Sequence, residues 1–182
     1  RMEHMFYGEG SEQPLFLLRK MIVSKTERER RIALNEMFKF VKKDIKETLM
    51  VMKGHPVTIR LLDPPLHEFV PHDAEKLHHL GKELGISMSM LKRRVLALHE
   101  NNPMLGHRGV RLGISYPEIT EMQVRAIFEA TAEMLKAGKK AFPEIMIPVT
   151  VTVNELTHQK EIVDRVYKEV CEKMKMKKIP YL

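Results

Sequence analysis

Short apolar segments that alternate with long segments of helical periodicity most constrain how this chain can fold. The first of these segments contains the β-branched residues Val57 and Ile59 and is ended by two prolines, as buried strands are. These segments lie at residues 56–62, 109–114 and 143–151, and a fourth would begin at 179–182. Strands that are apolar throughout and separated by helices favour a parallel sheet covered by helices. The sequence therefore predicts an α/β fold.

Both a β/α barrel and an open doubly wound sheet fit this order of elements. No glycine-rich phosphate-binding motif follows any of the predicted strands, which weakens the nucleotide-binding form of the open sheet. The connection between the first two predicted strands is longer than an ordinary barrel loop. We therefore interpret residues 63–102 as a helical segment inserted into a partial barrel.

Capping residues and glycines mark the predicted helix boundaries. A capping box at residues 26–29 opens a helix that ends at Gly54, and another at residues 120–123 opens a helix that runs through Lys136. Residues 73–100 are predicted to be helical in two or more pieces. The residues expected to cap the other helices share a short polar side chain: Asp73, Ser87, and Asn154 or Thr157 before a helix that reaches about Met176.

Composition excludes several classes of protein. The single cysteine, Cys171, excludes an intramolecular disulfide and favours a reducing compartment, so we expect the cytoplasm or an organelle matrix. No apolar stretch reaches the roughly 18 residues that a membrane span needs. The 31 basic and 24 acidic residues favour acidic partners, but the chain has no Trp and only four Tyr and seven Phe for base stacking. We therefore predict neither a membrane partner nor a nucleic-acid partner.

Arginines beside the predicted strands are the candidate functional residues. Arg60 lies in an otherwise apolar run and needs an anionic partner if it is buried. In a structural role, the partner of Arg60 would be Asp63 or a carboxylate on a neighbouring element. In a binding role, the planar guanidinium would clamp the phosphate or carboxylate of a ligand. Residues at the carboxyl ends of barrel strands face the active site, which favours the second role. Arg108 and Arg111 flank a predicted strand on opposite faces, and we predict that Arg108 faces the ligand.

The histidines and the cysteine predict no metal site. His67, His72, His78 and His79 lie close together in the sequence, but their spacing matches no metal-binding motif. We interpret them as surface or packing residues. Cys171 has charged neighbours on a predicted helix, and we interpret it as an inert thiol.

Segments in colinear order resemble the pyruvate, phosphate dikinase family over nearly the whole chain. They are RMEHMF from Arg1, PVTIRLLDPPLHEF from Pro56, NPMLGHRGVRLGI from Asn102, YPEITEMQ from Tyr116 and PEIMIP from Pro143. Phosphoenolpyruvate synthase and enzyme I of the sugar phosphotransferase system share the general layout, but their counterpart of the segment from Leu61 to Phe69 differs. The chain also departs from the family after Pro148, where Val149 replaces the usual start of a Leu-Val pair.

The resemblance implies a fragment of the C-terminal phosphoenolpyruvate/pyruvate-binding domain, about the first half of a TIM-type (β/α)8 barrel. Enzymes of this family interconvert ATP, phosphate and pyruvate with AMP, pyrophosphate and phosphoenolpyruvate through a phosphohistidine on a swivelling domain. By the same resemblance, Arg1, Arg60 and Arg108 hold the phosphoryl group and the substrate. The Mg²⁺ ligands, the acid/base cysteine and the carrier histidine are expected outside this chain.

Several expectations follow from that resemblance. The full-length parent is expected to be a homo-oligomer, and the 182 residues alone are expected to be catalytically inactive, with exposed strand edges and apolar faces. Two other interpretations stay open, a fragment of a phosphoenolpyruvate synthase and a non-catalytic binding or interaction module. Dependence of the full-length enzyme on inorganic phosphate would distinguish a pyruvate, phosphate dikinase from a phosphoenolpyruvate synthase.

Overall fold

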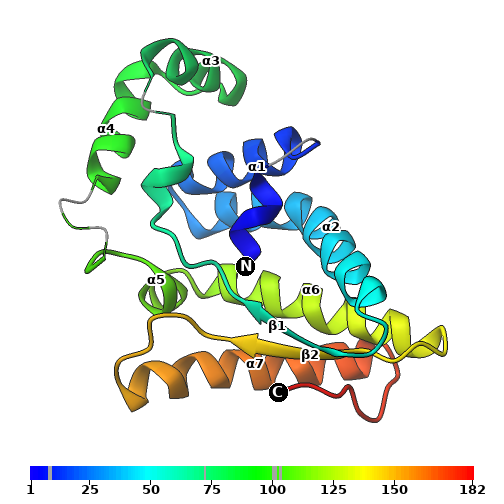
Figure 1. The fold of residues 1–182 in the computed structure, drawn as a ribbon. Coiled ribbons are helices and arrows are strands. Elements are labelled where there is room, and N and C mark those ends of the chain that lie inside the picture. Colours follow the sequence, from blue (N-terminus) through cyan, green and yellow to red (C-terminus); the bar gives the residue numbers. More distant parts are fainter. Residues whose placement is uncertain (8–9, 72, 100–101, 103) are drawn as a thin grey trace.

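The computed structural model describes residues 1–182 except 8, 9, 72, 100, 101 and 103. The chain has an α/β fold that is mostly helical and contains a two-stranded parallel sheet (Figure 1). The 3-10 helices are η1 (Met2–Phe6) and η2 (Leu66–Phe69), and the strands are β1 (Pro56–Arg60) and β2 (Phe142–Met146). The α-helices are α1 (Glu12–Val23), α2 (Glu27–Val51), α3 (Ala74–Leu84), α4 (Met88–Leu98), α5 (Gly109–Ser115), α6 (Pro117–Lys136) and α7 (Val153–Lys173). In the described residues, no helix combines the length and the apolar character needed to cross a membrane.

The sheet joins two of the predicted strands. β1 and β2 run parallel, with Pro56 opposite Phe142 and Arg60 opposite Met146, and the connection between them contains α3 to α6. This confirms the prediction of parallel pairing for these two segments. Both strands are shorter than predicted.

Leu182 extends the pattern of the sheet beyond β2. The Leu182 N–H donates to the carbonyl of Pro143 at 3.1 Å, and the Ile145 N–H donates to the carbonyl of Leu182 at 2.7 Å. Bonds that reach in this way to both sides of one residue are typical of a parallel ladder. Residues 179–182 are not a strand in this structure, but Leu182 pairs with β2 where the fourth strand was predicted.

The predicted strand at residues 109–114 is wrong, because this segment forms the helix α5. Gly113 lets α5 approach α7 closely, since a Cβ at this position would lie 2.5 Å from Oε1 of Gln159. Val110, Leu112 and Gly113 are buried while Ile114 is exposed, which is a helical pattern of burial and not the alternation of a strand. A short apolar run is ambiguous between strand and helix, and packing on α7 decides it here.

The predicted start of α6 is also wrong. The helix begins at Pro117 and not at the capping box of residues 120–123. Proline suits the first position of a helix because its fixed φ is helical and its missing N–H would have no partner there. Thr120 lies inside the helix and donates a hydrogen bond to Oε1 of Gln159 at 2.8 Å.

The cap of α2 acts as predicted, whereas the predicted cap of α7 is wrong. Thr26 accepts the Glu29 N–H at 3.2 Å, and the Glu29 carboxylate accepts the Lys25 N–H at 2.7 Å. Helix α7 is capped by Thr152, which forms a complete capping box with Glu155, and not by Asn154 or Thr157. Helix α1 has no counterpart among the predicted elements.

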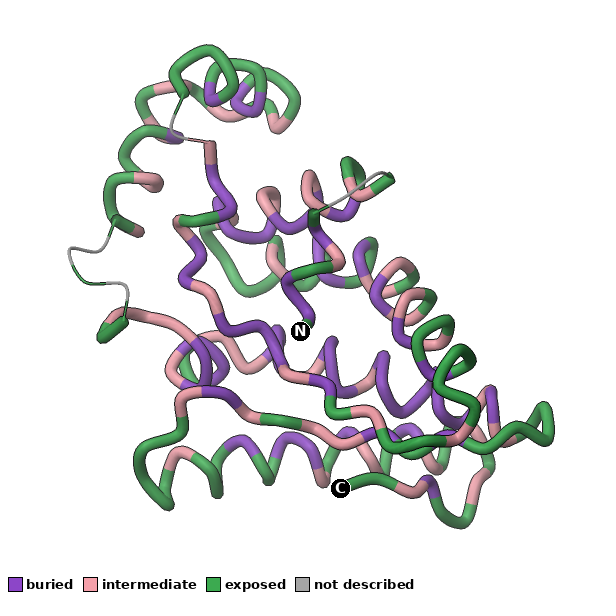
Figure 2. Tube along the Cα trace, viewed as in Figure 1, coloured by how far each residue is buried: buried purple, intermediate pink, exposed green. Residues whose placement is uncertain are grey.

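Helix α6 is the centre of the molecule. It lies between α2 and α7 and packs along both (Figure 1), and it is buried along most of its length (Figure 2). Lys46 of α2 pairs with Glu133 of α6 at 2.6 Å, and Lys173 of α7 pairs with Glu129 of α6 at 2.7 Å. By contrast with α6, most residues of α3 and α4 are exposed, and in α4 the buried residue is Leu91 (Figure 2).

Candidate functional site

Two of the three predicted arginines meet at the carboxyl end of β1. Arg60 is the last residue of that strand, Asp63 lies three residues further along the chain, and Arg108 immediately precedes α5. Nε and Nη2 of Arg108 donate to Oδ1 and Oδ2 of Asp63 at 3.2 and 2.8 Å, a bidentate pair. Nη1 of Arg60 lies 3.2 Å from Oδ2 of the same carboxylate. Asp63 therefore holds together two arginines that are far apart in the sequence.

Backbone contacts fix the start of α5 beside Asp63. The Gly109 N–H donates to the Asp63 carbonyl at 3.1 Å, and the Val110 N–H donates to the Pro148 carbonyl at 2.9 Å. Gly109 has φ +54°, and a Cβ there would lie 2.7 Å from the Pro148 carbonyl oxygen, so only glycine fits without strain. Val149 also has a positive φ, +61°, which is rare for a β-branched residue. The segment that departs from the family pattern is thus strained where it contacts α5.

A fourth residue, Glu3, completes the group, which we call the arginine cluster: Glu3, Arg60, Asp63 and Arg108. Nη2 of Arg60 donates to Oε1 of Glu3, which lies on η1 and is only 6% exposed. Among the described residues, the buried Arg60 Nε and Glu3 Oε2 have no hydrogen-bond partner. Burying a polar atom without a hydrogen bond costs free energy of folding. Arg60 Nε and Glu3 Oε2 are therefore a donor and an acceptor that a ligand could satisfy.

The electrostatics of the cluster keep Arg108 charged. Its hydrogen bonds to Asp63 raise the pKa of the Arg108 guanidinium above its ordinary value, against the opposing effect of burial. Both carboxylate partners that the sequence allowed for Arg60 are present, Asp63 nearby in the chain and Glu3 on another element. The ion pairs therefore fit a structural role for Arg60 as well as a role in binding anions.

Arg1 does not join the cluster. It is exposed and lines a cavity of about 370 Å³ whose walls include Thr58 and Asp44. No hydrogen bond or ion pair in the described residues connects its side chain to Arg60 or Arg108. A binding role for Arg1 stays a prediction.

Arg111 differs from the prediction in its surroundings. Because residues 109–115 form a helix, the argument from strand alternation does not apply to it. Its Nη1 donates to the Gly106 carbonyl at 2.9 Å, outside the cluster. Arg111 therefore supports the loop before α5.

Glu3 is the one residue of the arginine cluster that the sequence did not single out as a candidate or as a named partner. It lies within the block RMEHMF, which was singled out for its arginine. The one available signal is that it is the only acidic residue of an otherwise apolar and basic block. The distance along the chain from Glu3 to Arg60 hides their contact until the fold is known.

The histidines that the structure describes do not assemble into a metal site. Rings of His67 and His99 lie 6.1 Å apart, Nδ1 of His79 lies 3.4 Å from Glu83, and His72 is outside the described residues. In the part of the chain that the structure describes, no group of three His, Cys, Asp or Glu side chains could hold a metal ion. The carboxylates of Glu3 and Asp63 are engaged by arginines, so they do not fit Mg²⁺ either.

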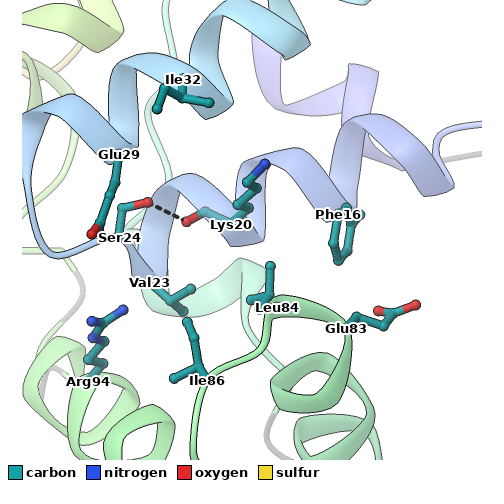
Figure 3. A pocket seen from close by; sticks show the side chains of 10 residues that line it. All are labelled: Phe16, Lys20, Val23, Ser24, Glu29, Ile32, Glu83, Leu84, Ile86 and Arg94. Carbon is teal, nitrogen blue, oxygen red and sulfur yellow. Dashed lines mark hydrogen bonds between the residues drawn. The ribbon is translucent and has the colours of Figure 1, made fainter.

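A second cavity, larger than the one beside Arg1, lies between α1, α2 and the α3–α4 pair (Figure 3). It has a volume of about 470 Å³, and Phe16, Val23 and Ile86 form part of its apolar wall. Its polar groups are mostly engaged: Lys20 pairs with Glu36 at 3.1 Å, and the Ser24 hydroxyl donates to the Lys20 carbonyl at 2.7 Å. This cavity contains none of the predicted arginines.

Comparison with known proteins identifies the family to which this chain belongs. A family model described as the PEP-binding domain of PEP-utilising enzymes matches residues 1–181, so the chain belongs to that family. The chain is 47% identical over 171 residues to pyruvate, phosphate dikinase of Rhizobium meliloti (strain 1021) and 44% identical over 171 residues to that of Clostridium symbiosum. It is 46% identical over 172 residues to the chloroplastic pyruvate, phosphate dikinase of Mesembryanthemum crystallinum.

These matches cover 93% of this chain but only 18–19% of the length of those relatives. They confirm the family resemblance that the sequence segments indicated. The chain thus corresponds to a small part of proteins that are much longer.

Proposed function

We propose that this chain is part of the phosphoenolpyruvate/pyruvate-binding barrel of a pyruvate, phosphate dikinase, and that Arg60 and Arg108 bind the phosphoryl group there. The convergence of both guanidinium groups on Asp63, at the carboxyl end of a parallel strand, carries this proposal. Parallel strands of β/α barrels place their ligand-binding residues at this end. Two forked donors side by side suit a phosphoryl group, whose oxygens accept bidentate hydrogen bonds.

The partial barrel is the proposed setting of this site. The parallel pairing of β1 with β2, the helical crossover between them and the bonds of Leu182 to β2 support it. In this arrangement residues 63–102, which contain α3 and α4, are the insertion between barrel segments. The exposed apolar side chains of Phe142 and Met146, at the two ends of β2, form surfaces that the rest of a barrel would cover.

In the full-length protein, the arginines would act on phosphoryl transfer between a phosphohistidine and pyruvate. They would orient the group and balance the charge on its oxygens as it transfers. Mg²⁺, bound by residues outside this chain, would supply stabilisation of the pyruvate enolate. Arg1 is proposed as a third ligand of the substrate, and assembly as a homo-oligomer in the cytoplasm or an organelle matrix is part of the same proposal.

The substitution Arg60→Lys in the full-length protein tests this function. Lys keeps the charge but loses the planar fork, so phosphoryl exchange with pyruvate should fall by about a hundredfold to a thousandfold. Phosphorylation of the carrier histidine from ATP and phosphate should survive, because that half-reaction takes place at another domain. Arg111→Lys is the matched control and should leave both half-reactions intact.

Two results would contradict the proposal. If both half-reactions fell together, or if neither fell, Arg60 would be a structural arginine. Dependence on inorganic phosphate and release of pyrophosphate would further separate a dikinase from a phosphoenolpyruvate synthase.

A further inference from the structure

The charges of the arginine cluster already cancel without any bound anion. Two guanidinium groups, of Arg60 and Arg108, face two carboxylates, of Glu3 and Asp63. If both carboxylates stayed in place, a phosphoryl group entering this site would meet two negative charges within a few ångströms. Repulsion at such short range is strong in a half-buried site. Binding of an anion therefore requires one carboxylate to leave its arginine.

We propose that Glu3 occupies the Arg60 guanidinium in the substrate-free site and that the phosphoryl group of the substrate displaces it. This inference rests on the proposed function, and it adds to it a residue that competes with the substrate for the same donors. Glu3 would then set the affinity of the site for phosphoryl groups.

Asp63 is held too firmly to be the group that leaves. Both of its carboxylate oxygens accept hydrogen bonds from Arg108, one of them also lies 3.2 Å from Arg60, and its carbonyl accepts the Gly109 N–H. Glu3 is bound to Arg60 through Oε1 alone, and its Oε2 has no partner among the described residues. It also lies on η1, a single short 3-10 helix, which is a weaker support than an α-helix.

The unpartnered atoms show which contact a phosphoryl group would improve. Nε and Nη2 form one edge of a guanidinium and can donate two parallel hydrogen bonds to one oxyanion. Glu3 uses Nη2 but not Nε, which stays buried without a partner, while Nη1 faces Asp63. A phosphoryl group could take both donors on this edge and leave the contact of Nη1 with Asp63 in place.

The ligand that fits this exchange is a phosphomonoester or its phosphonate analogue. Such a group presents two acceptor oxygens to one guanidinium edge and carries more negative charge than the carboxylate that it replaces. A simple monocarboxylate offers the same geometry but no gain in charge. The site should therefore discriminate between phosphoryl groups and carboxylates through competition with Glu3.

The test is the affinity of the full-length protein for phosphonopyruvate, which cannot transfer its phosphonate, measured by calorimetry in the presence of Mg²⁺. Glu3→Gln keeps the size of the side chain and removes its charge, so the dissociation constant should fall by about tenfold, which corresponds to roughly 1.4 kcal/mol. Glu68→Gln is the matched control. Glu68 is an exposed carboxylate whose charge reaches Arg108 without an ion pair in the described residues, and its substitution should change the affinity by less than about twofold.

Unchanged or weaker binding of phosphonopyruvate by Glu3→Gln would overturn the inference. That result is expected if Glu3 only holds Arg60 in place and does not compete with the ligand. Arg60→Gln separates this outcome from a failure of the proposed function. If Arg60→Gln binds phosphonopyruvate as well as the unsubstituted protein, the proposed function fails. If Arg60 is needed but Glu3→Gln brings no gain, only the displacement of Glu3 fails.

Hydrogen exchange of the unsubstituted protein provides a measurement that needs no variant. The N–H groups of His4 and Tyr7 donate to the carbonyls of Arg1 and His4 at 3.2 and 3.3 Å, and these bonds hold η1 together. If the ligand displaces Glu3, exchange in residues 1–7 should quicken on saturation with phosphonopyruvate. Slower or unchanged exchange there would contradict the displacement of Glu3 even if the variants fail to fold.

Discussion

The arginine cluster and the large cavity beside α1 are two charged regions that differ in how their polar groups are satisfied. The cavity is roomy, but Lys20 pairs with Glu36 and the Glu29 carboxylate accepts the Lys25 N–H. The cluster is small, yet it holds an unpartnered arginine nitrogen and an unpartnered carboxylate oxygen in buried positions.

This difference shows why volume is a poor guide to chemistry in this molecule. A large apolar cavity is the usual first candidate for a binding site. Here, however, the groups with unfilled hydrogen-bonding capacity lie at the carboxyl end of β1, where parallel α/β folds bind ligands. Substitutions in the cluster should therefore have larger effects than substitutions in the wall of the cavity.

Asp63→Ala should cause the largest loss of stability. It leaves Arg60 and Arg108 largely buried without the carboxylate that joins them, which typically costs about 3–5 kcal/mol of unfolding free energy. Glu83→Ala in the wall of the cavity should change stability by less than about 0.5 kcal/mol. Urea denaturation of both variants measures these losses of unfolding free energy. Equal losses would show that the cluster is no more important for stability than the wall of the cavity.

Gly109→Ala should destabilise the cluster through its backbone. The new Cβ would lie 2.7 Å from the Pro148 carbonyl oxygen at a positive φ, so we expect a loss of about 2–3 kcal/mol. Gly138→Ala is the matched control, because Gly138 also has a positive φ but has no atom within 4 Å of its added Cβ. That variant should lose only about 1 kcal/mol. Similar melting temperatures for the two variants would show that the contact with Pro148 is unimportant.

Glu29, in the wall of the cavity, should give stability a weak dependence on acid. The hydrogen bond from the Lys25 N–H lowers the pKa of the Glu29 carboxyl below its ordinary value of 4.5. A lowered pKa in the folded state contributes stability above the unfolded pKa, and this contribution is lost as the pH falls through the folded pKa. The stability difference between the unsubstituted protein and Glu29→Gln should therefore be present at neutral pH and shrink below about pH 4.5. A difference that grows in acid would contradict this.

Arg94→Gln should have no measurable effect on phosphoryl binding. Arg94 lines the cavity and contacts the sulfur of Met90 at 3.6 Å, away from the cluster. We expect its dissociation constant for phosphonopyruvate to stay within about twofold of that of the unsubstituted protein. A clear loss of affinity would show that the cavity and the arginine cluster are coupled.

Much of the site could be predicted from local sequence. Arg60 and Arg108 stood out because arginine in or beside an apolar run needs an anion, and Asp63 stood close to Arg60 as one possible partner. The structure places all three together. Their proximity to Glu3 could not be predicted, because it depends on how η1 packs and not on any spacing in the chain.

The sequence by itself determined the elements whose signals are local: the capped helix α2, the capped first turn of α3, and the two β-branched runs that became β1 and β2. Only the tertiary structure decided that residues 109–115 form the helix α5 and that Glu3 lies against Arg60. The physical reason is range. Caps, glycines and β-branched residues act on their own neighbours, whereas the close approach at Gly113 and the ion pair across Arg60 exist only once distant segments have packed.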